Sequence, residues 1–301
     1  MKIHHVLTPR GERRPLTLAI GFFDGVHLGH RAILDQLQVL RRIDTALAVL
    51  TFVNHPSEYL RPNEIPPLLT VVEERVNLLA ACGLDELYLL PFDAHVAEIS
   101  ARTFLATYLL EQLRVQALIV GEGFRFGHDR EGDVALACEQ LTPHGIIVQA
   151  APQVQFVGER VSSTRIREAL ARAEMPDVDA MLGASYSISG TVMLGAGRGH
   201  DLGFPTANLR VDPRKALPCD GVYTVVARSD GRDYPGLLSL GTNPTFGQTG
   251  RSLEVWIKGF TRSIYGEQLR IEQLRFLREQ QRFADVSELV VQMQLDAEAL
   301  V

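Results

Sequence analysis

The sequence lacks the usual marks of membrane-inserted, disulfide-stabilised and polybasic proteins. It has no run of eighteen apolar residues, and its first segment, MKIHHVLTPRGERR, lacks the apolar core of a signal peptide. The three cysteines, Cys82, Cys138 and Cys219, form no CxxC pair and predict reduced, mostly buried thiols. A net charge of -6 argues against a general nucleic-acid binder. We expect a cytoplasmic protein without membrane or nucleic-acid partners.

What is present is the composition of an ordinary globular protein with more than one domain. A chain of 301 residues exceeds the usual size of a single domain. Its 46% hydrophobic and 22% charged residues are sufficient to bury a core. The sequence pattern changes between Ala173 and Gly183, so we predict domains at 1–180 and 181–301.

In the first half, short apolar runs alternate with helical periodicities. Strands are predicted over residues 16–23, 46–53, 86–92 and 117–121. Helices are predicted over 30–42, over 73–83 and around Leu105. Strands that alternate with helices pair in parallel through right-handed crossovers. The first half is therefore predicted to be an open α/β sheet.

The second half consists of short segments rich in β-forming residues. The predicted strands cover residues 185–194, 221–227, 253–260 and 269–277. Turn signals separate them, such as SDGRD and GTNPTFGQTG. An amphipathic helix from residue 286 closes the chain. This spacing favours a compact antiparallel sheet or small barrel that ends in a helix.

The first chemical motif is GFFDGVHLGHRAIL, residues 21–34, where a strand ends and a helix begins. Backbone N–H groups at a helix N-terminus form an anion site. His27 and His30 are spaced i, i+3, so both imidazoles can donate to one phosphate chain. A solvated surface pair and a metal-binding pair are the alternatives, and no third ligand lies close enough in sequence to favour a metal.

Two further segments carry weaker signals. The loop VGEGFRFGHDREGD, residues 120–133, follows a parallel strand, where open α/β sheets bind ligands. The segment SSTRIREAL, residues 162–170, offers Ser163 or Thr164 as a helix cap and places Arg165 and Arg167 near the helix start. Arginines there oppose the helix dipole and favour a nearby anion. Taken alone, the loop favours a ligand site over a long surface turn, whereas the second segment favours an ordinary capped surface helix.

Together these motifs resemble the adenylyltransferase module of bacterial bifunctional riboflavin kinase/FAD synthetases. The segment GTVMLGAGRGHDLGFPTANL, residues 190–209, resembles the riboflavin kinase signature of the same family, and GFPTAN is its most specific piece. The resemblance covers nearly the whole chain in one order. It implies a Rossmann-like nucleotidyltransferase α/β domain, followed by an antiparallel β-barrel riboflavin kinase domain that ends in a helix.

The resemblance also implies roles for individual residues. Glu254 would be the base that takes a proton from the ribityl hydroxyl, while His27, His30 and Arg167 would neutralise charge during adenylyl transfer. The nucleotide-binding residues would be Gly21, Phe23, Asp24, Gly25, Ser163, Thr164, Gly195, Gly197, Gly199 and Gly203. The flavin-binding residues would be His55, Gly123, Phe124 and Arg278. Thr206 and Asn208 would hold Mg²⁺ through hard oxygen atoms.

The implied function is phosphorylation of riboflavin to FMN by ATP, then adenylylation of FMN to FAD with release of pyrophosphate. Mg²⁺ is the expected cofactor, and the chain is expected to be a monomer or weak homo-oligomer. The chain departs from the family pattern at several positions, among them Gly123 for Asp or Asn, Asn54 for Pro, Ala184-Ser185 for Arg-Pro, His200 for Arg and Trp256 for His.

Those departures leave alternatives open. One is a monofunctional riboflavin kinase whose N-terminal module is inactive or regulatory, as the loss of a polar side chain at Gly123 would suggest. Another is a flavin- or nucleotide-binding regulator without turnover. A third is a nucleotidyltransferase with a different substrate, because paired-histidine boxes occur across related enzymes.

Overall fold

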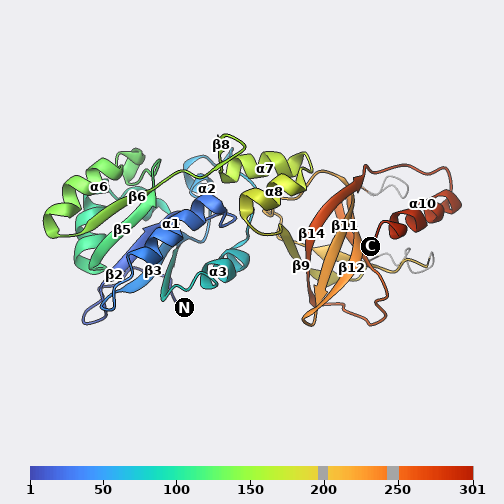
Figure 1. Cartoon of the computed structure of the whole chain (residues 1–301), viewed down its shortest axis with the longest axis horizontal. Helices are drawn as coiled ribbons and strands as arrows, with labels where there is room; N and C mark the ends of the chain where they lie inside the picture. The colour runs from blue at the N-terminus through green and yellow to red at the C-terminus, as the bar shows by residue number, and fades with distance from the viewer. Residues whose placement is uncertain (196–202, 243–250, 301) are drawn as a thin grey trace. The chain divides into compact units, whose positions relative to one another are not determined.

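The computed structural model describes residues 1–195, 203–242 and 251–300, and its contacts divide the chain into two units. The first unit is Met1–Ser163 and the second is Thr164–Val301 (Figure 1). The contacts group the helices that follow Ser163 with the second unit. The domain boundary expected between residues 180 and 181 stays a prediction.

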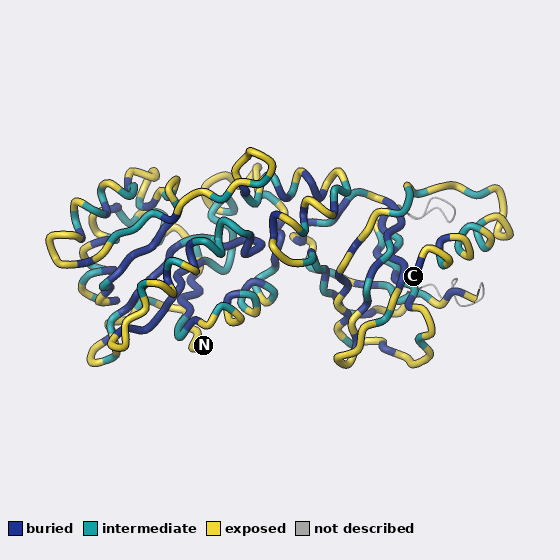
Figure 2. The backbone as a smooth tube through the Cα atoms, in the orientation of Figure 1, coloured by how far each residue is buried: buried dark blue, intermediate teal, exposed yellow. Residues whose placement is uncertain are grey.

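The first unit is built on a parallel six-stranded sheet, as the alternating pattern predicts. In order across the sheet, the strands are β1 (Lys2–His4), β4 (Glu86–Leu90), β3 (Ala46–Phe52), β2 (Leu16–Ile20), β5 (Val115–Gly121) and β6 (Ile147–Ala151). Strand β2 is buried along its whole length, which explains why it appears as a continuous apolar run in the sequence (Figure 2).

Helices cover both faces of this sheet and bury separate apolar clusters against it. Leu37 of α1 (Leu28–Val39) and Leu79 of α3 (Val72–Ala80) belong to one cluster. Leu109 and Leu141 belong to the other, on the π-helix Phe104–Gln112 that continues α5 (Ala101–Thr103) and on α6 (Val134–Leu141). The shorter elements are α2 (Ser57–Leu60), α4 (Ala94–Ala97), the 3₁₀ turns His128–Arg130 and Thr142–His144, and the hairpin β7 (Gln155–Phe156) and β8 (Glu159–Arg160).

The strand order reverses between β2 and β5. From β2 the chain moves through β3 to β4 on one side, whereas β5 and β6 lie on the other side. The connections of an open α/β sheet diverge at such a point and leave a crevice at the carboxyl ends of the strands. Here the crevice lies beyond Ile20 of β2 and Gly121 of β5.

The second unit contains a closed antiparallel barrel and ends in a helix, in agreement with the predicted fold class. Around the barrel, the strands are β10 (Thr206–Arg210), β13 (Arg251–Ile257), β12 (Arg232–Thr242), β11 (Gly221–Ser229), β14 (Gln268–Arg278) and β9 (Ser187–Met193). Helices α7 (Ser163–Ala171) and α8 (Met175–Leu182) precede the barrel, and α10 (Val286–Glu298) follows it. The PTAN segment, which alone suggests a turn, enters the barrel as strand β10.

Two sequence expectations concern the whole chain. Within residues 1–195, 203–242 and 251–300, no helix has the length and apolar character needed to cross a membrane. Cys82, Cys138 and Cys219 are free thiols and each is half-buried.

Candidate functional site

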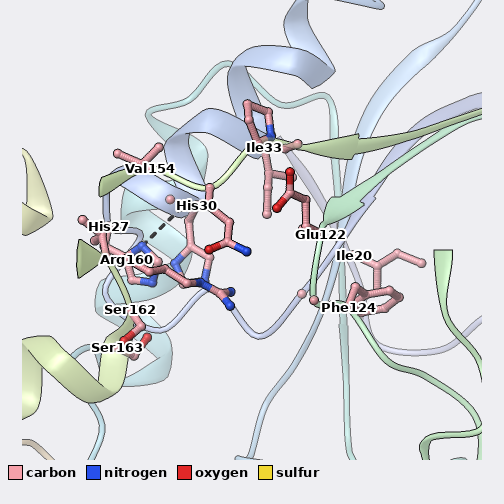
Figure 3. Close-up of a pocket in the computed structure, with 18 residues that line it drawn as sticks. Ile20, His27, His30, Ile33, Glu122, Phe124, Val154, Arg160, Ser162 and Ser163 are labelled. Atoms are coloured by element: carbon pink, nitrogen blue, oxygen red, sulfur yellow. Dashed lines mark hydrogen bonds between the residues drawn. The ribbon is translucent and has the colours of Figure 1, made fainter. Parts of the chain in front are cut away.

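A pocket opens at the crevice between β2 and β5 (Figure 3). Its lining comes from the ends of β2, β5 and β6, from the start of α1 and from the segment that follows β8. The lining residues are Ile20, Gly21, His27, Gly29, His30, Ile33, Gly121, Glu122, Gly123, Phe124, Ala151, Pro152, Gln153, Val154, Arg160, Val161, Ser162 and Ser163. The pocket thus brings together parts of all three N-terminal motifs.

His27 is the N-cap of helix α1. Its Nδ1 accepts a hydrogen bond from the backbone N–H of His30 at 3.3 Å, replacing the Ser, Thr, Asp or Asn that usually caps a helix. Because Nδ1 accepts, the neutral ring carries its hydrogen on Nε2. The side chain is 6% exposed, so it is not part of a solvated surface pair. The imidazole therefore both starts the helix and presents an N–H donor.

His30 stacks on His27, with ring centroids 3.7 Å apart and the ring planes at 19°. Burial lowers the pKa of His30 well below its usual value, and electrostatic interactions with His27 and with the cationic side chains of Arg75 and Arg160 lower it further. The ring is therefore neutral at pH 7. The permanent charges of Arg75 and Arg160 near the two neutral rings attract an anion, so the pocket suits a phosphate chain.

Asp24 and its neighbours shape the turn that leads to the histidines. The buried Asp24 carboxylate accepts hydrogen bonds from the backbone N–H groups of Leu69 and Thr70, at 3.1 and 2.9 Å. Its backbone carbonyl accepts a hydrogen bond from Ser163 Oγ at 2.9 Å. Phe23 is fully buried with a φ of 57°, an uncommon value for a residue with a side chain. Of the predicted nucleotide contacts in this half, Gly21 and Ser163 line the pocket, whereas Phe23, Asp24 and Gly25 do not.

Arg160 is a pocket residue that the sequence reasoning missed. It ends the short strand β8, and its side chain extends beside the histidine rings (Figure 3). A Cβ added at Gly123 would lie 3.5 Å from Arg160 Nη1, which is an ordinary contact. The glycine that departs from the family pattern therefore faces a guanidinium and leaves room for a larger residue. A two-residue strand gives no periodic signal in the sequence. The one available indication of a role for Arg160 was its position just before the SSTR segment.

The loop after β3 holds the predicted flavin contact His55. The His55 ring meets the Phe22 ring edge-to-face at 4.6 Å, and its Nδ1 accepts from the Ser57 N–H at 3.0 Å. Asn54, in the place of a family proline, exchanges two hydrogen bonds with the backbone of Phe92, at 2.9 and 2.8 Å. Asn54 therefore fixes this backbone, because its side-chain amide is bound through both its nitrogen and its oxygen.

The loop after β5 is packed tightly on the start of α5. A Cβ at Gly127, whose φ is +77°, would lie 2.5 Å from the backbone nitrogen of Ala101. We expect Gly127→Ala to destabilise the first unit by about 2–4 kcal/mol, since overpacking adds to the strain of a positive φ. Thermal or urea unfolding measures the loss. Gly158→Ala is the matched control: its φ is also +77°, but no atom lies within 4 Å of an added Cβ. Equal losses in both variants would show that the contact with Ala101 is unimportant.

The barrel carries a polar row on its outer face. Glu254 of β13 pairs in register with Asn208 of β10 and with Ser239 of β12. Residues paired across neighbouring strands point to the same face of a sheet. Leu253 and Val255, which flank Glu254, are buried on the opposite, inner face. Glu254 therefore lies outside the barrel core, half-buried between two polar neighbours.

Thr206 completes this row, because its Oγ1 donates a hydrogen bond to Glu254 Oε2 at 3.2 Å. A Cβ added at Gly195 would lie 2.0 Å from the amide nitrogen of Asn208, so a larger residue there would displace the Asn208 side chain. Gly203 has a φ of +81° with open space around it. The predicted nucleotide contacts Gly197 and Gly199 lie outside the described residues.

Aromatic rings flank the row on one side. Trp256 pairs in register with Thr206, and its ring centroid lies 5.1 Å from that of the buried Phe204. Trp256 stands where the family pattern has histidine, so an apolar wall replaces a polar group beside Thr206.

The remaining predicted residues are Arg278, Thr164 and Arg167. The Arg278 guanidinium binds the buried carboxylate of Asp296, with Nε–Oδ1 at 2.9 Å and Nη2–Oδ2 at 2.6 Å, which ties α10 to β14. Thr164 and Arg167 lie on α7 in the second unit. The roles expected for these three residues stay predictions.

Oxygen donors dominate the polar row. Over residues 1–195, 203–242 and 251–300, no group of three His, Cys, Asp or Glu side chains is placed to hold a metal. The hydroxyl of Thr206 and the amide of Asn208 are hard ligands of the kind that Mg²⁺ uses together with water and substrate phosphates. These residues therefore fit a Mg²⁺–nucleotide complex better than a metal held by protein ligands alone.

Comparison with known proteins finds a family match for each half of the chain. Residues 10–165 match the family described as FAD synthetase, and residues 182–300 match riboflavin kinase. The bifunctional riboflavin kinase/FMN adenylyltransferase of Escherichia coli strain K12 is 36% identical over 93% of this chain and 90% of that protein. The protein of the same name from Bacillus subtilis strain 168 is 31% identical over 99% of this chain and 95% of that protein.

A solved structure also matches along the chain. It comes from Streptococcus pneumoniae, is described as a macrolide-efflux protein, and is 29% identical with a TM-score of 0.89. The match covers 100% of this chain and 99% of that one. Its description names a different activity from those of the relatives above, so it supports the fold, whereas the family matches bear on the chemistry.

Proposed function

The chain belongs to the family of bifunctional riboflavin kinase/FMN adenylyltransferases, and on that premise we propose that it makes FMN and FAD at two separate sites. The second unit would phosphorylate riboflavin, and the first would join FMN to the adenylyl group of ATP. The observation that carries the proposal is the presence of two unrelated polar constellations on two folds: a stacked histidine pair at a strand-order reversal, and a Thr206–Glu254 hydrogen bond on a barrel.

In the kinase reaction, Glu254 would accept the proton of the ribityl 5′-hydroxyl as that oxygen attacks the γ-phosphorus of ATP and ADP leaves. The hydrogen bond from Thr206 fixes one carboxylate oxygen, Oε2. Thr206 and Asn208 would hold Mg²⁺, which when bound neutralises phosphate charge. The absence of a side chain at Gly195 leaves room for the Asn208 amide, and Asn208 pairs in register with Glu254.

In the adenylyl transfer, a phosphate oxygen of FMN would attack the α-phosphorus of ATP and pyrophosphate would leave. No protein nucleophile is needed, so catalysis would rest on positioning and charge neutralisation. His27, with its hydrogen on Nε2, would donate to the phosphates beside His30 and the N-terminus of α1. Arg160 would add a cation from β8, and Arg167 from α7 is a further candidate.

In the first unit, we place the flavin contacts at Phe124 and His55. Phe124 lines the pocket and offers a ring for stacking, and His55, in the loop after β3, contacts the Phe22 ring edge-to-face. Three half-buried free thiols are compatible with work in the reducing cytosol, which we propose as the location.

Chromatography of the products from riboflavin, ATP and Mg²⁺ tests the proposal. We expect FMN to appear first and FAD to follow. The monofunctional kinase is not favoured, because the first half matches the FAD synthetase family and retains both histidines. Formation of FMN without FAD would nevertheless restore that alternative. Flavin binding with neither product would identify a regulator instead.

A glycine in the pocket provides a finer test. A Cβ at Gly29 would lie 3.1 Å from the His27 ring, tight enough to move it. We expect Gly29→Ala to reduce FAD formation from FMN about tenfold, because displacing a catalytic donor by a fraction of an ångström weakens its contact with the transition state. Gly123→Ala, in the same pocket but in ordinary contact, should stay within about twofold. Steady-state rates of both variants measure the difference, and equal rates would contradict the placement of His27.

A further inference from the structure

Arg75 is a buried charge behind the pocket. It lies on α3, its exposed fraction is 0%, and it heads the fully buried side chains by volume. An arginine keeps its charge at all physiological pH values, and burying a charge is costly unless surrounding groups compensate it. An apolar side chain of similar volume would fill the same space without that cost. The charge therefore calls for a role beyond packing.

The guanidinium joins the two loops that follow β2 and β3. Its Nη2 donates to the carbonyl oxygens of Phe52 and Val53, at 2.5 and 3.3 Å. Its central carbon lies 4.3 Å from the centre of the Phe22 ring, within the range of a cation–π contact. Phe22 in turn meets the His55 ring at 4.6 Å. One side chain thus fixes both the histidine-bearing turn and the start of the His55 loop.

Arg75 also acts on the histidine pair. The groups whose charge lowers the pKa of His30 are His27 on the same helix turn, Arg75 on α3 and Arg160 on β8. Arg160 is largely exposed, so water screens its charge, whereas the charge of buried Arg75 acts through a medium of low polarity. Arg75 is therefore the member of this set whose charge is permanent and least screened by water.

We propose that Arg75 is a positioning residue of the adenylyl-transfer site, which holds the Phe22 turn and the His55 loop in place and supplies a permanent positive charge behind the histidine pair. The inference rests on the proposed function of that site. The nucleotide phosphates would be drawn toward this charge without touching Arg75. No sequence signal marks it, because an arginine on a helix suggests a solvated face.

Two substitutions separate charge from geometry. Arg75→Met fills similar space without charge, and Arg75→Lys keeps the charge but loses the planar group that spans the carbonyl oxygens and the Phe22 ring. With FMN and ATP as substrates, we expect kcat/KM for FAD formation to fall about 100-fold in the Met variant, mainly through KM for ATP. The Lys variant should recover about tenfold of that loss. Riboflavin phosphorylation should stay within about twofold in both.

Histidine titration by NMR on the full chain gives a readout that a merely structural role would not move. Removing a neighbouring positive charge favours protonation, so the pKa of His30 should be higher in the Met variant than in the wild type. In a plot of FAD formation against pH, the part of the curve that depends on the protonation of His30 should also shift to higher pH in the Met variant. The Lys variant should retain the wild-type pKa of His30.

Several outcomes would overturn the inference. A Met variant with the wild-type KM for ATP and the wild-type pKa of His30 would do so. If a variant lost both activities and also lost the thermal unfolding transition of the first unit, Arg75 would be needed only for folding. If the Met variant does not fold, the Lys variant decides: full wild-type FAD formation would refute the geometric part. A wild-type protein that forms no FAD would sink the proposed function, while the His30 titration would still test the electrostatic part.

Discussion

His27→Asn is expected to lose FAD formation by about 10²–10³-fold while it still phosphorylates riboflavin at the wild-type rate. Asparagine is a favoured N-cap, so its side-chain oxygen can still accept the hydrogen bond from the His30 N–H. It cannot stack on the His30 ring or present an imidazole N–H to a phosphate. The variant therefore removes the chemistry and keeps the helix start. Chromatography that separates FMN from FAD measures both activities in one sample.

His27→Ala is the companion variant, because it removes the cap as well. It should lose the same activity as His27→Asn and about 1 kcal/mol more of the unfolding free energy. Comparison of the two variants separates capping from catalysis. A parallel decline of FMN and FAD formation in both would contradict the assignment of one reaction to each unit.

Glu254→Gln is expected to show the opposite pattern. Riboflavin phosphorylation should fall by about 10²–10⁴-fold, the usual contribution of a positioned general base. The amide oxygen can still accept the hydrogen bond from Thr206, so the strand geometry should persist. FAD formation from supplied FMN should remain unchanged, since that reaction belongs to the other unit.

Ser239→Ala is the matched control for Glu254→Gln. Ser239 flanks Glu254 in the same row and accepts a hydrogen bond from Gln280 at 3.0 Å. Removing its hydroxyl disturbs the polar row and leaves the carboxylate, so phosphorylation should stay within about threefold. If Glu254→Gln phosphorylates riboflavin as fast as Ser239→Ala, Glu254 is not the base.

The architecture was largely predictable, because burial leaves a direct mark on sequence. Strand β2 is buried along its length and appears as an uninterrupted apolar run between turn residues. Strand β10 was missed as a strand, because its short PTAN segment contains a proline–threonine turn signal that tertiary pairing with β9 and β13 overrides. The strands of the β7–β8 hairpin are too short to show an alternating pattern of apolar and polar residues in the sequence.

The site was predictable where a local turn creates it. His27, His30 and Ser163 lie in segments whose spacing alone points to a helix start, and all three line the pocket. Arg160 and Arg75 were not predictable, because their roles depend on contacts between segments far apart in the chain. The tie between Asp24 and the backbone of residues 69–70 is likewise set by tertiary structure.

A mixing experiment tests the claim of two separate sites most directly. Given riboflavin, ATP and Mg²⁺, His27→Asn alone should accumulate FMN, and Glu254→Gln alone should leave riboflavin almost unchanged. An equimolar mixture should make FAD, because FMN released by the first variant can be adenylylated by the second. A mixture of two folded variants that forms FMN but no FAD would contradict the account.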